Sequence, residues 1–170
     1  ISLQRAMRNA NEGVNFLQTA DVAAGNISTV LIRMREIAIQ SATGSNSDDD
    51  RAALDNEFSE LRAHLSKSID GTSWNGQKML NGTMSNLNLQ IGASSSDSQS
   101  VEMADFRDLS ALSAAGVSNT GDALASLSII DESLTTIDSA RVKWGAAMNL
   151  LVQAGDPSHN LPTNLDSSRT

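Results

Sequence analysis

Several residue types that build reactive sites or thick cores are scarce in this sequence. Cysteine is absent, which excludes disulfides, thiolate metal ligands and cysteine nucleophiles. Aromatic residues make up 3% of the chain and include no tyrosine, so few large side chains are available as core anchors. The composition therefore favours thin helix-on-helix packing over a rounded globule.

The charge balance and the absence of long apolar runs argue against two classes of partner. The formal net charge is −8, and an acidic surface repels nucleic-acid phosphates and anionic lipid headgroups. No apolar run approaches the roughly eighteen residues that a membrane-spanning helix needs. We therefore expect no nucleic acid and no membrane among the partners.

The longest regular pattern covers residues 1–43. Small or apolar residues recur there in alternating steps of three and four, which places them on one seam of a helix. The seam residues are Leu3, Ala6, Ala10, Gly13, Leu17, Ala20, Ala24, Ile27, Leu31, Met34 and Ala38. A helix of this length is weak alone, so it must bury its seam against an element of similar length.

A second helix is expected over residues 49–69. Gly44 is a natural C-terminal stop for the first helix. Ser47 followed by three aspartates resembles an N-cap, because acids in the first turn favour the positive end of the helix dipole. The apolar stripe of this second helix is Leu54, Phe58, Leu61, Leu65 and Ile69. The short connection implies that it folds back antiparallel on the first.

Residues 74–103 follow a different pattern. Asn75-Gly76 and Asn81-Gly82 are turn dipeptides, and residues 87–91 alternate as a half-buried strand does. We expect a β-hairpin region here. The connection over residues 104–118 is rich in Ala, Leu and Ser and is predicted to contain one short helical turn.

The third helix is predicted over residues 119–155. Its seam has the same spacing as the first and consists of Ala123, Leu127, Ile130, Leu134, Ile137, Arg141, Trp144, Met148 and Leu151. Only Arg141 interrupts the apolar run. Residues 156–170 contain Pro157 and Pro162 and are expected to form an irregular tail, since proline opposes a helix interior.

These patterns predict a mainly α fold. We expect one elongated antiparallel helical bundle, or coiled-coil rod, with a small β-hairpin element at one end. The first and third helices should lie side by side, and the whole chain, residues 1–170, should form a single rod-like domain.

No pattern typical of a reaction centre is present. The sequence has no Gly-rich phosphate loop, nucleophile elbow or HExxH motif. His64 and His159 lack further ligands at metal spacing, so structural or solvent roles are expected for both. Aspartates 48–50 could suggest calcium, but successive acids on a helix point apart. We therefore expect no enzyme, no metal and no cofactor.

Two further sequence features concern sugars: two tryptophans that could bind them and two patterns for their attachment. Trp74 and Trp144 could stack on sugar rings, together with the polar loop over residues 94–100. The alternative is that Trp144 belongs to the seam and that Trp74 fills the junction between helix and hairpin. Asn26-Ile-Ser and Asn81-Gly-Thr match the pattern for N-glycosylation.

Six stretches in matching order resemble bacterial flagellin. They are RNANEGV (8–14), LIRMREIAIQSA (31–42), DRAAL (50–54), WNGQKMLNG (74–82), LQIGA (89–93) and residues 129–149. The resemblance covers nearly the whole chain. It implies the core rod domain of a filament subunit, without the N- and C-terminal polymerisation segments, as the uncapped start at Ile1 also suggests. No outer variable domain is expected, because only residues 103–119 occupy its place.

The resemblance implies a secreted structural protein of the bacterial flagellum. Its partners would be copies of itself in a helical filament, for which the missing termini are needed, together with an export chaperone and a cap protein. Two alternatives are the hook–filament junction protein and a cell-surface polysaccharide-binding flagellin-like protein. The match at residues 74–93 and across the first helix favours flagellin.

The resemblance also implies a contact surface for a host Toll-like receptor that senses flagellin. The matching residues are Arg33, Arg35, Glu36, Ile37 and Glu57. Alternatively, these side chains are solvated or contact neighbouring subunits. Near the end of the chain, Asn149-Leu150-Leu151 and the two prolines depart from the family pattern.

Overall fold

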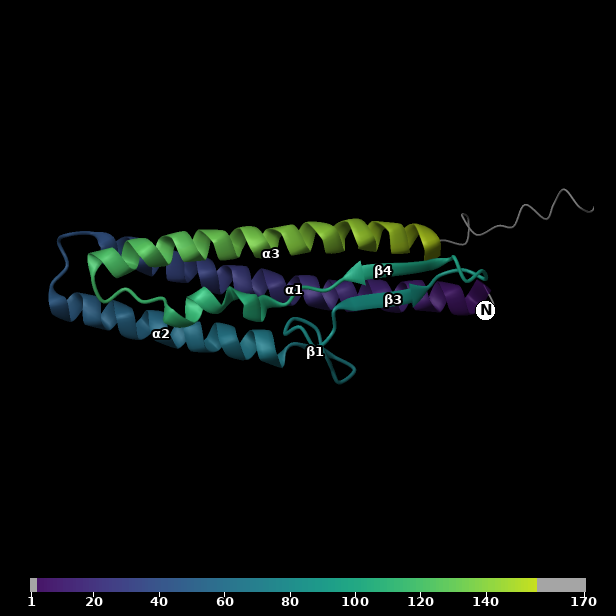
Figure 1. Ribbon diagram of the computed structural model, residues 1–170, viewed down its shortest axis with the longest axis horizontal. Helices are drawn as coiled ribbons and strands as arrows, with labels where there is room; N and C mark the ends of the chain where they lie inside the picture. The colour runs from purple at the N-terminus through teal and green to yellow at the C-terminus, as the bar shows by residue number, and fades with distance from the viewer. Residues whose placement is uncertain (1–2, 156–170) are drawn as a thin grey trace, which may run out of the picture.

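The computed structural model describes residues 3–155 as a slender rod (Figure 1). Its long helices are α1 (Leu3–Ala42), α2 (Asp48–Gly71) and α3 (Thr120–Gly155). Between α2 and α3 lie the strands β1 (Ser73–Trp74), β2 (Gln77–Lys78), β3 (Asn86–Gln90) and β4 (Ser98–Glu102), and the 3-10 helix η1 (Phe106–Ala114). The predicted mainly α rod with a small β element is confirmed. The tail with Pro157, His159 and Pro162 lies outside the described residues.

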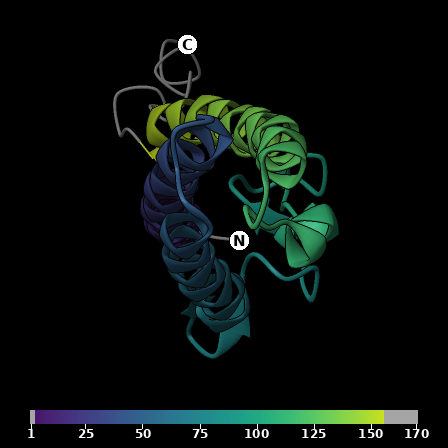
Figure 2. The ribbon, with the colours of Figure 1, turned by 90° about the vertical axis from the view of Figure 1, so that its left-hand side faces the viewer.

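Helix α1 is the centre of the rod. Helix α3 runs beside it, α2 lies beside its C-terminal half, and the β3–β4 hairpin lies along its N-terminal half (Figure 1). Seen along the rod, the three helices form an arc, and η1 and the hairpin lie on its concave side (Figure 2). The hairpin therefore packs against the flank of the rod near one end.

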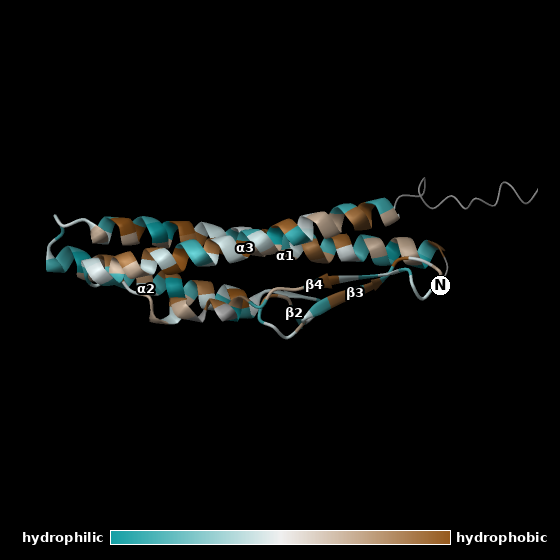
Figure 3. Ribbon diagram, turned by 45° about the horizontal axis from the view of Figure 1, so that its top comes forward, coloured by the Kyte–Doolittle hydropathy of each residue, from teal (hydrophilic) through white to brown (hydrophobic). Residues whose placement is uncertain are grey.

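The predicted seam is the main core. Every seam residue of α1 after Leu3 is buried, and Ile130, Ile137, Trp144 and Leu151 of α3 are fully buried against them. Figure 3 shows the corresponding alternation of hydrophobic and hydrophilic residues along each helix. Leu3 is 49% exposed. Gly155, the last described residue of α3, lies level with Ala10 and Asn11, so Leu3 extends beyond the described part of α3.

Arg141, the only charged residue of the α3 seam, is paired across the interface. Its Nε lies 2.9 Å from Oδ1 of Asp21 on α1. This hydrogen bond raises the pKa of Arg141 further above its ordinary value. Gly25 leaves room for the guanidinium, since a Cβ there would lie 3.3 Å from Nη2. The seam thus accommodates the charge of Arg141 because Asp21 pairs with it and Gly25 has no side chain in its way.

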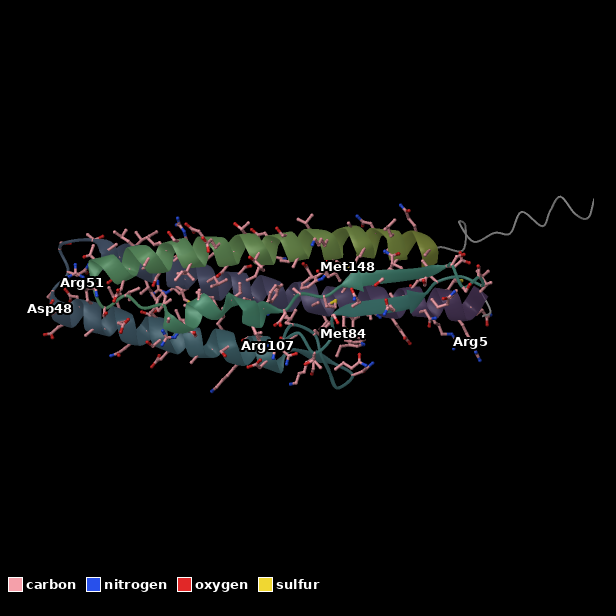
Figure 4. The ribbon with its side chains drawn as sticks, viewed as in Figure 1. Arg5, Asp48, Arg51, Met84, Arg107 and Met148 are labelled. Atoms are coloured by element: carbon pink, nitrogen blue, oxygen red, sulfur yellow. The ribbon has the colours of Figure 1, made fainter. Side chains whose placement is uncertain are left out.

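The turn between α1 and α2 is held by side-chain hydrogen bonds. Ser47 is the N-cap of α2, as predicted, and forms a capping box with Asp50. Arg51, labelled beside this end in Figure 4, donates to the carbonyls of Ser41 and Thr43 and to Oγ1 of Thr120. One arginine therefore joins the end of α1 to the starts of α2 and α3.

The β3–β4 hairpin rests on the first turns of α1. Asn9 Nδ2 donates to the Gln90 carbonyl at 2.9 Å. Gly13 lies beneath Leu89, and a Cβ at position 13 would come within 2.3 Å of Leu89 Cδ1 and 3.0 Å of Leu151 Cδ1. On the other strand, the Glu102 carbonyl accepts from Trp144 Nε1. The hairpin is thus fixed to both long helices.

The connection after the hairpin is more ordered than predicted. Instead of one helical turn it forms the nine-residue 3-10 helix η1, with a break at Leu109 (φ −72°, ψ 31°). The following residues are tied by polar contacts, since Asp55 Oδ1 accepts from Val117 N and Ser41 Oγ donates to the Val117 carbonyl. These contacts fix the end of the connection against α1 and α2, and η1 itself contacts α2 and α3.

We predict opposite effects for alanine at two helical glycines. Gly13→Ala should lower the free energy of unfolding by roughly 1–3 kcal/mol, because the new methyl group displaces Leu89 and Leu151. Gly145→Ala is the matched control. A Cβ at Gly145 has no neighbour within 4 Å, so this substitution should stabilise by about 0.4–1 kcal/mol. Urea unfolding midpoints at unchanged m-value measure both. Equal effects would contradict the proposed seating of the hairpin.

We also predict a pH dependence that is specific to Asp50. Hydrogen bonds from the backbone and side chain of Ser47 lower the pKa of Asp50. Since the folded pKa is the lower one, the stabilisation is complete above the unfolded aspartate pKa of about 3.9 and is lost as the pH falls through the folded value. Asp50→Asn should therefore weaken the acid dependence of unfolding more than Asp49→Asn, a control in the same exposed turn. Identical acid profiles for the two variants would exclude this linkage.

Candidate interaction surface

Arg33 joins α1 to α2 at the surface. Its Nη2 lies 2.8 Å from Glu57 Oε1, its Nε donates to the same oxygen, and its Nη1 lies 3.2 Å from Glu36 Oε2. The hydrogen bond with Glu57 is the main reason that the pKa of Arg33 is raised, and the bond with Glu36 adds to it. The side chain of Arg33 is 50% exposed. The three charges therefore form an accessible, internally paired patch.

Arg35 lies on the opposite edge of α1. Its Nε donates to Asp131 Oδ1 of α3 at 2.8 Å, and both side chains are about half exposed. Asp131 was not among the residues predicted for this surface. Its partner could not be found from spacing, because the register between α1 and α3 is set by packing. The surface thus extends from α2 across α1 to α3.

Ile37 does not belong to this surface, and its prediction as a contact residue is wrong. The side chain is 0% exposed. Helix α1 is flanked by α2 on one side and α3 on the other, so its buried arc is wider than the single predicted seam. Ile37 falls within that wider arc next to Ala38. The candidate surface is therefore defined as Arg33, Arg35, Glu36 and Glu57, with Asp131 added by the structure.

The two tryptophans occupy different environments. Trp144 is fully buried and packs against Phe106 with ring centroids 6.1 Å apart, so it cannot stack on a ligand from solvent. Trp74 is half-buried and borders a shallow surface hollow lined by Asn15, Gln18, Thr19 and Val22. Of the two residues considered for sugar stacking, only Trp74 is accessible.

The remaining chemical signals are dispersed. His64 is exposed on α2. Within residues 3–155, no three His, Cys, Asp or Glu side chains gather where they could hold a metal ion. The lowered pKa values of Asp50 and Asp105 arise from hydrogen bonds to Ser47 and Arg107 respectively, in two separate parts of the rod. No helix among the described residues is long and apolar enough to cross a membrane. The charged face across α1 is thus the feature best suited to recognition.

The sequence matches bacterial flagellins along most of its length. The family model for the bacterial flagellin N-terminal helical region matches residues 2–85. A flagellin from Halalkalibacterium halodurans is 33% identical over 99% of this chain, which covers 63% of that protein. Flagellin B from Vibrio anguillarum is 42% identical over 62% of this chain, which covers 28% of that protein. The chain thus spans less than two thirds of the length of these relatives.

Solved structures share the fold. Flagellin from Bacillus cereus aligns with a TM-score of 0.82 and 24% identity over 96% of this chain and 93% of its own. A Vibrio parahaemolyticus chain described as a flagellar hook-associated protein aligns with a TM-score of 0.75 and 16% identity, over 94% of this chain and 85% of its own. At these identities the likeness concerns the fold alone. The sequence matches, extending over nearly all of the rod, show that this chain belongs to the bacterial flagellin family.

Proposed function

We propose that this protein is a structural subunit of the bacterial flagellar filament, exported from the cell and assembled there with copies of itself. The observation that carries the proposal is the 33% identity to a flagellin across 99% of the chain. The burial of the α1 seam from Ala6 to Ala38 supports it. The role is structural, with no reaction assigned to it. An export chaperone and a filament cap would be its partners during assembly.

The surface of the rod is consistent with packing between copies. Several large apolar side chains are exposed along the two longest helices, among them Val22 (64%) and Val142 (72%). A neighbouring subunit that packed along these helices would cover such side chains and remove apolar surface from water. A straight rod also offers long lateral faces, which repeated association requires.

The junction-protein alternative has the weaker support. The hook-associated chain of V. parahaemolyticus shares the fold at only 16% identity, and a common fold does not determine function. The sequence relatives reported above are flagellins at 33% and 42% identity. Sequence similarity therefore favours the filament subunit.

The filament proposal predicts assembly in solution. The full-length subunit, concentrated after purification, should form tubular filaments visible by electron microscopy and recoverable by sedimentation. Ile137→Asp is the control: it places an unpaired charge in the α1–α3 seam, prevents the rod from forming and should abolish filaments. Persistent monomers of the well-folded wild-type subunit would contradict the proposal.

We further propose that Arg33, Arg35, Glu36 and Glu57 form the contact surface for a flagellin-sensing Toll-like receptor. The four side chains are charged and accessible, and they lie on α1 and α2, with Arg33 and Arg35 at opposite edges of the exposed face of α1. Arginine is one of the three residue types that are enriched at the energetic hot spots of protein interfaces. The same face could also meet neighbouring subunits, so the receptor would bind the free subunit.

Alanine substitution separates recognition from stability. Arg33→Ala and Glu57→Ala should each change the free energy of unfolding by less than ~1 kcal/mol, since exposed ion pairs contribute little. Each should lower receptor activation by at least about tenfold, because losing a hydrogen-bonded charge at an interface costs more than about 1.4 kcal/mol.

The matched controls are Arg8→Ala on α1 and Glu60→Ala on α2, both at exposed positions. They should leave receptor activation unchanged in a cell reporter assay with monomeric protein. Equal activation by all four variants would exclude this face as the receptor contact.

A further inference from the structure

The two N-glycosylation patterns of the sequence lie in different structural environments. Asn26-Ile27-Ser28 lies in the middle of the 40-residue helix α1, whereas Asn81-Gly82-Thr83 lies in a turn between β2 and β3. A transferase must reach both the asparagine amide and the hydroxyl two residues later. The local fold therefore decides which of the two patterns can be used.

The pattern at Asn26 is inaccessible. Side chains at positions i and i+2 of a helix do not face each other. Ile27 is 1% exposed and Ser28 is 8% exposed, and the Ser28 hydroxyl is buried in the helix interface. The transferase could engage this hydroxyl only after α1 had separated from its neighbours, which would break the main core.

The pattern at Asn81 is already arranged as a turn. Oδ1 of Asn81 accepts two hydrogen bonds, from Thr83 N at 3.1 Å and from Thr83 Oγ1 at 2.6 Å. Gly82 permits this geometry through its positive φ of 79°. The amide and the hydroxyl of the pattern therefore face each other in the folded chain. Asn81 is partly exposed and Thr83 is exposed.

The bonds to Oδ1 also prepare the amide nitrogen chemically. Two donors at the carbonyl oxygen draw electron density from the carboxamide, which makes the Nδ2–H group more acidic. Within residues 3–155, no group accepts a hydrogen bond from Nδ2 in the structure. A polar hollow of about 480 Å³ opens beside Thr83 and is lined by Gln77, Lys78, Asn86 and Asn88 among others. Such side chains can hydrogen-bond the hydroxyls of a sugar.

We infer that Asn81 is an acceptor for N-linked glycosylation of the folded chain, with a nucleoside-diphosphate sugar as donor. The bond formed joins Nδ2 of Asn81 to the anomeric carbon. The bond broken joins that carbon to the diphosphate oxygen, which leaves with the electron pair, and a base of the transferase takes the proton from Nδ2. The first sugar would lie against the hollow beside Thr83.

The test is site mapping on the intact, folded chain. The purified protein is incubated with UDP-glucose and a soluble transferase that modifies Asn-x-Ser/Thr, and the modified residues are identified by tandem mass spectrometry. We expect glucose on Asn81 and none on Asn26. Unstructured peptides carrying each pattern should both be modified, which shows that the enzyme can use both sequences. An unmodified Asn81 in the folded chain, or equal modification of Asn26, would overturn the inference.

Variants refine the test. Thr83→Ala and Asn81→Gln should abolish incorporation, Thr83→Ser should retain it, and Asn26→Gln should leave it unchanged. Circular dichroism checks that each variant is folded. The ratio of modification at Asn81 to modification at Asn26 is measured in the wild-type chain, so it does not depend on the folding of any variant. The readout is a peptide mass, so its failure would not affect the filament proposal.

Discussion

The burial of two complementary seams, one on α1 and one on α3, is the constraint on which the rest of the structure depends. Isolated helices are marginal in water, and a 40-residue helix with a weakly hydrophobic sequence gains its stability from tertiary packing. Each fully buried large side chain of the seam, such as Ile130 or Leu31, contributes roughly 1.5–3 kcal/mol. Because the seams run the length of both helices, this stabilisation also makes the chain elongated and stiff.

The packing of α1 against α3 limits where the β3–β4 hairpin and the connection through η1 can lie. A small residue on α1 lets the hairpin approach the helix closely: Gly13 has no side chain where Leu89 packs. At the other end, Arg51 and Asp55 add hydrogen bonds to the backbone of Ser41 and Val117, two residues whose side chains are also buried. The hairpin and the connection are therefore consequences of the helix pair, and their polar contacts determine position more than they add stability.

Much of this could be predicted from the residues. Three-four spacing identified the buried side of α1, and Ser47 with its aspartates identified the start of α2. The spacing could not show how many neighbours flank α1, so Ile37 was wrongly placed on the surface. Nor could it give the partner of Arg35, because Asp131 is distant in sequence and is brought near only by the register of packing. Nor could it give the form of η1, whose first residue is held by distant parts of the chain: Phe106 N donates to the Leu80 carbonyl, and its ring packs against Trp144.

The ion pairs of the rod divide by what surrounds them, and this division bears on function. Arg141 and Asp21 join α3 to α1 across their interface and are 37% and 30% exposed, so water screens this pair less than a pair on the open surface. Arg33 and Glu57 lie half in solvent, where a pair contributes little to folding because water screens both charges. Stability therefore imposes little constraint on the residues at positions 33 and 57. We therefore propose contact with another protein, and not the needs of the fold, as the reason for an arginine at position 33 that donates to two carboxylates.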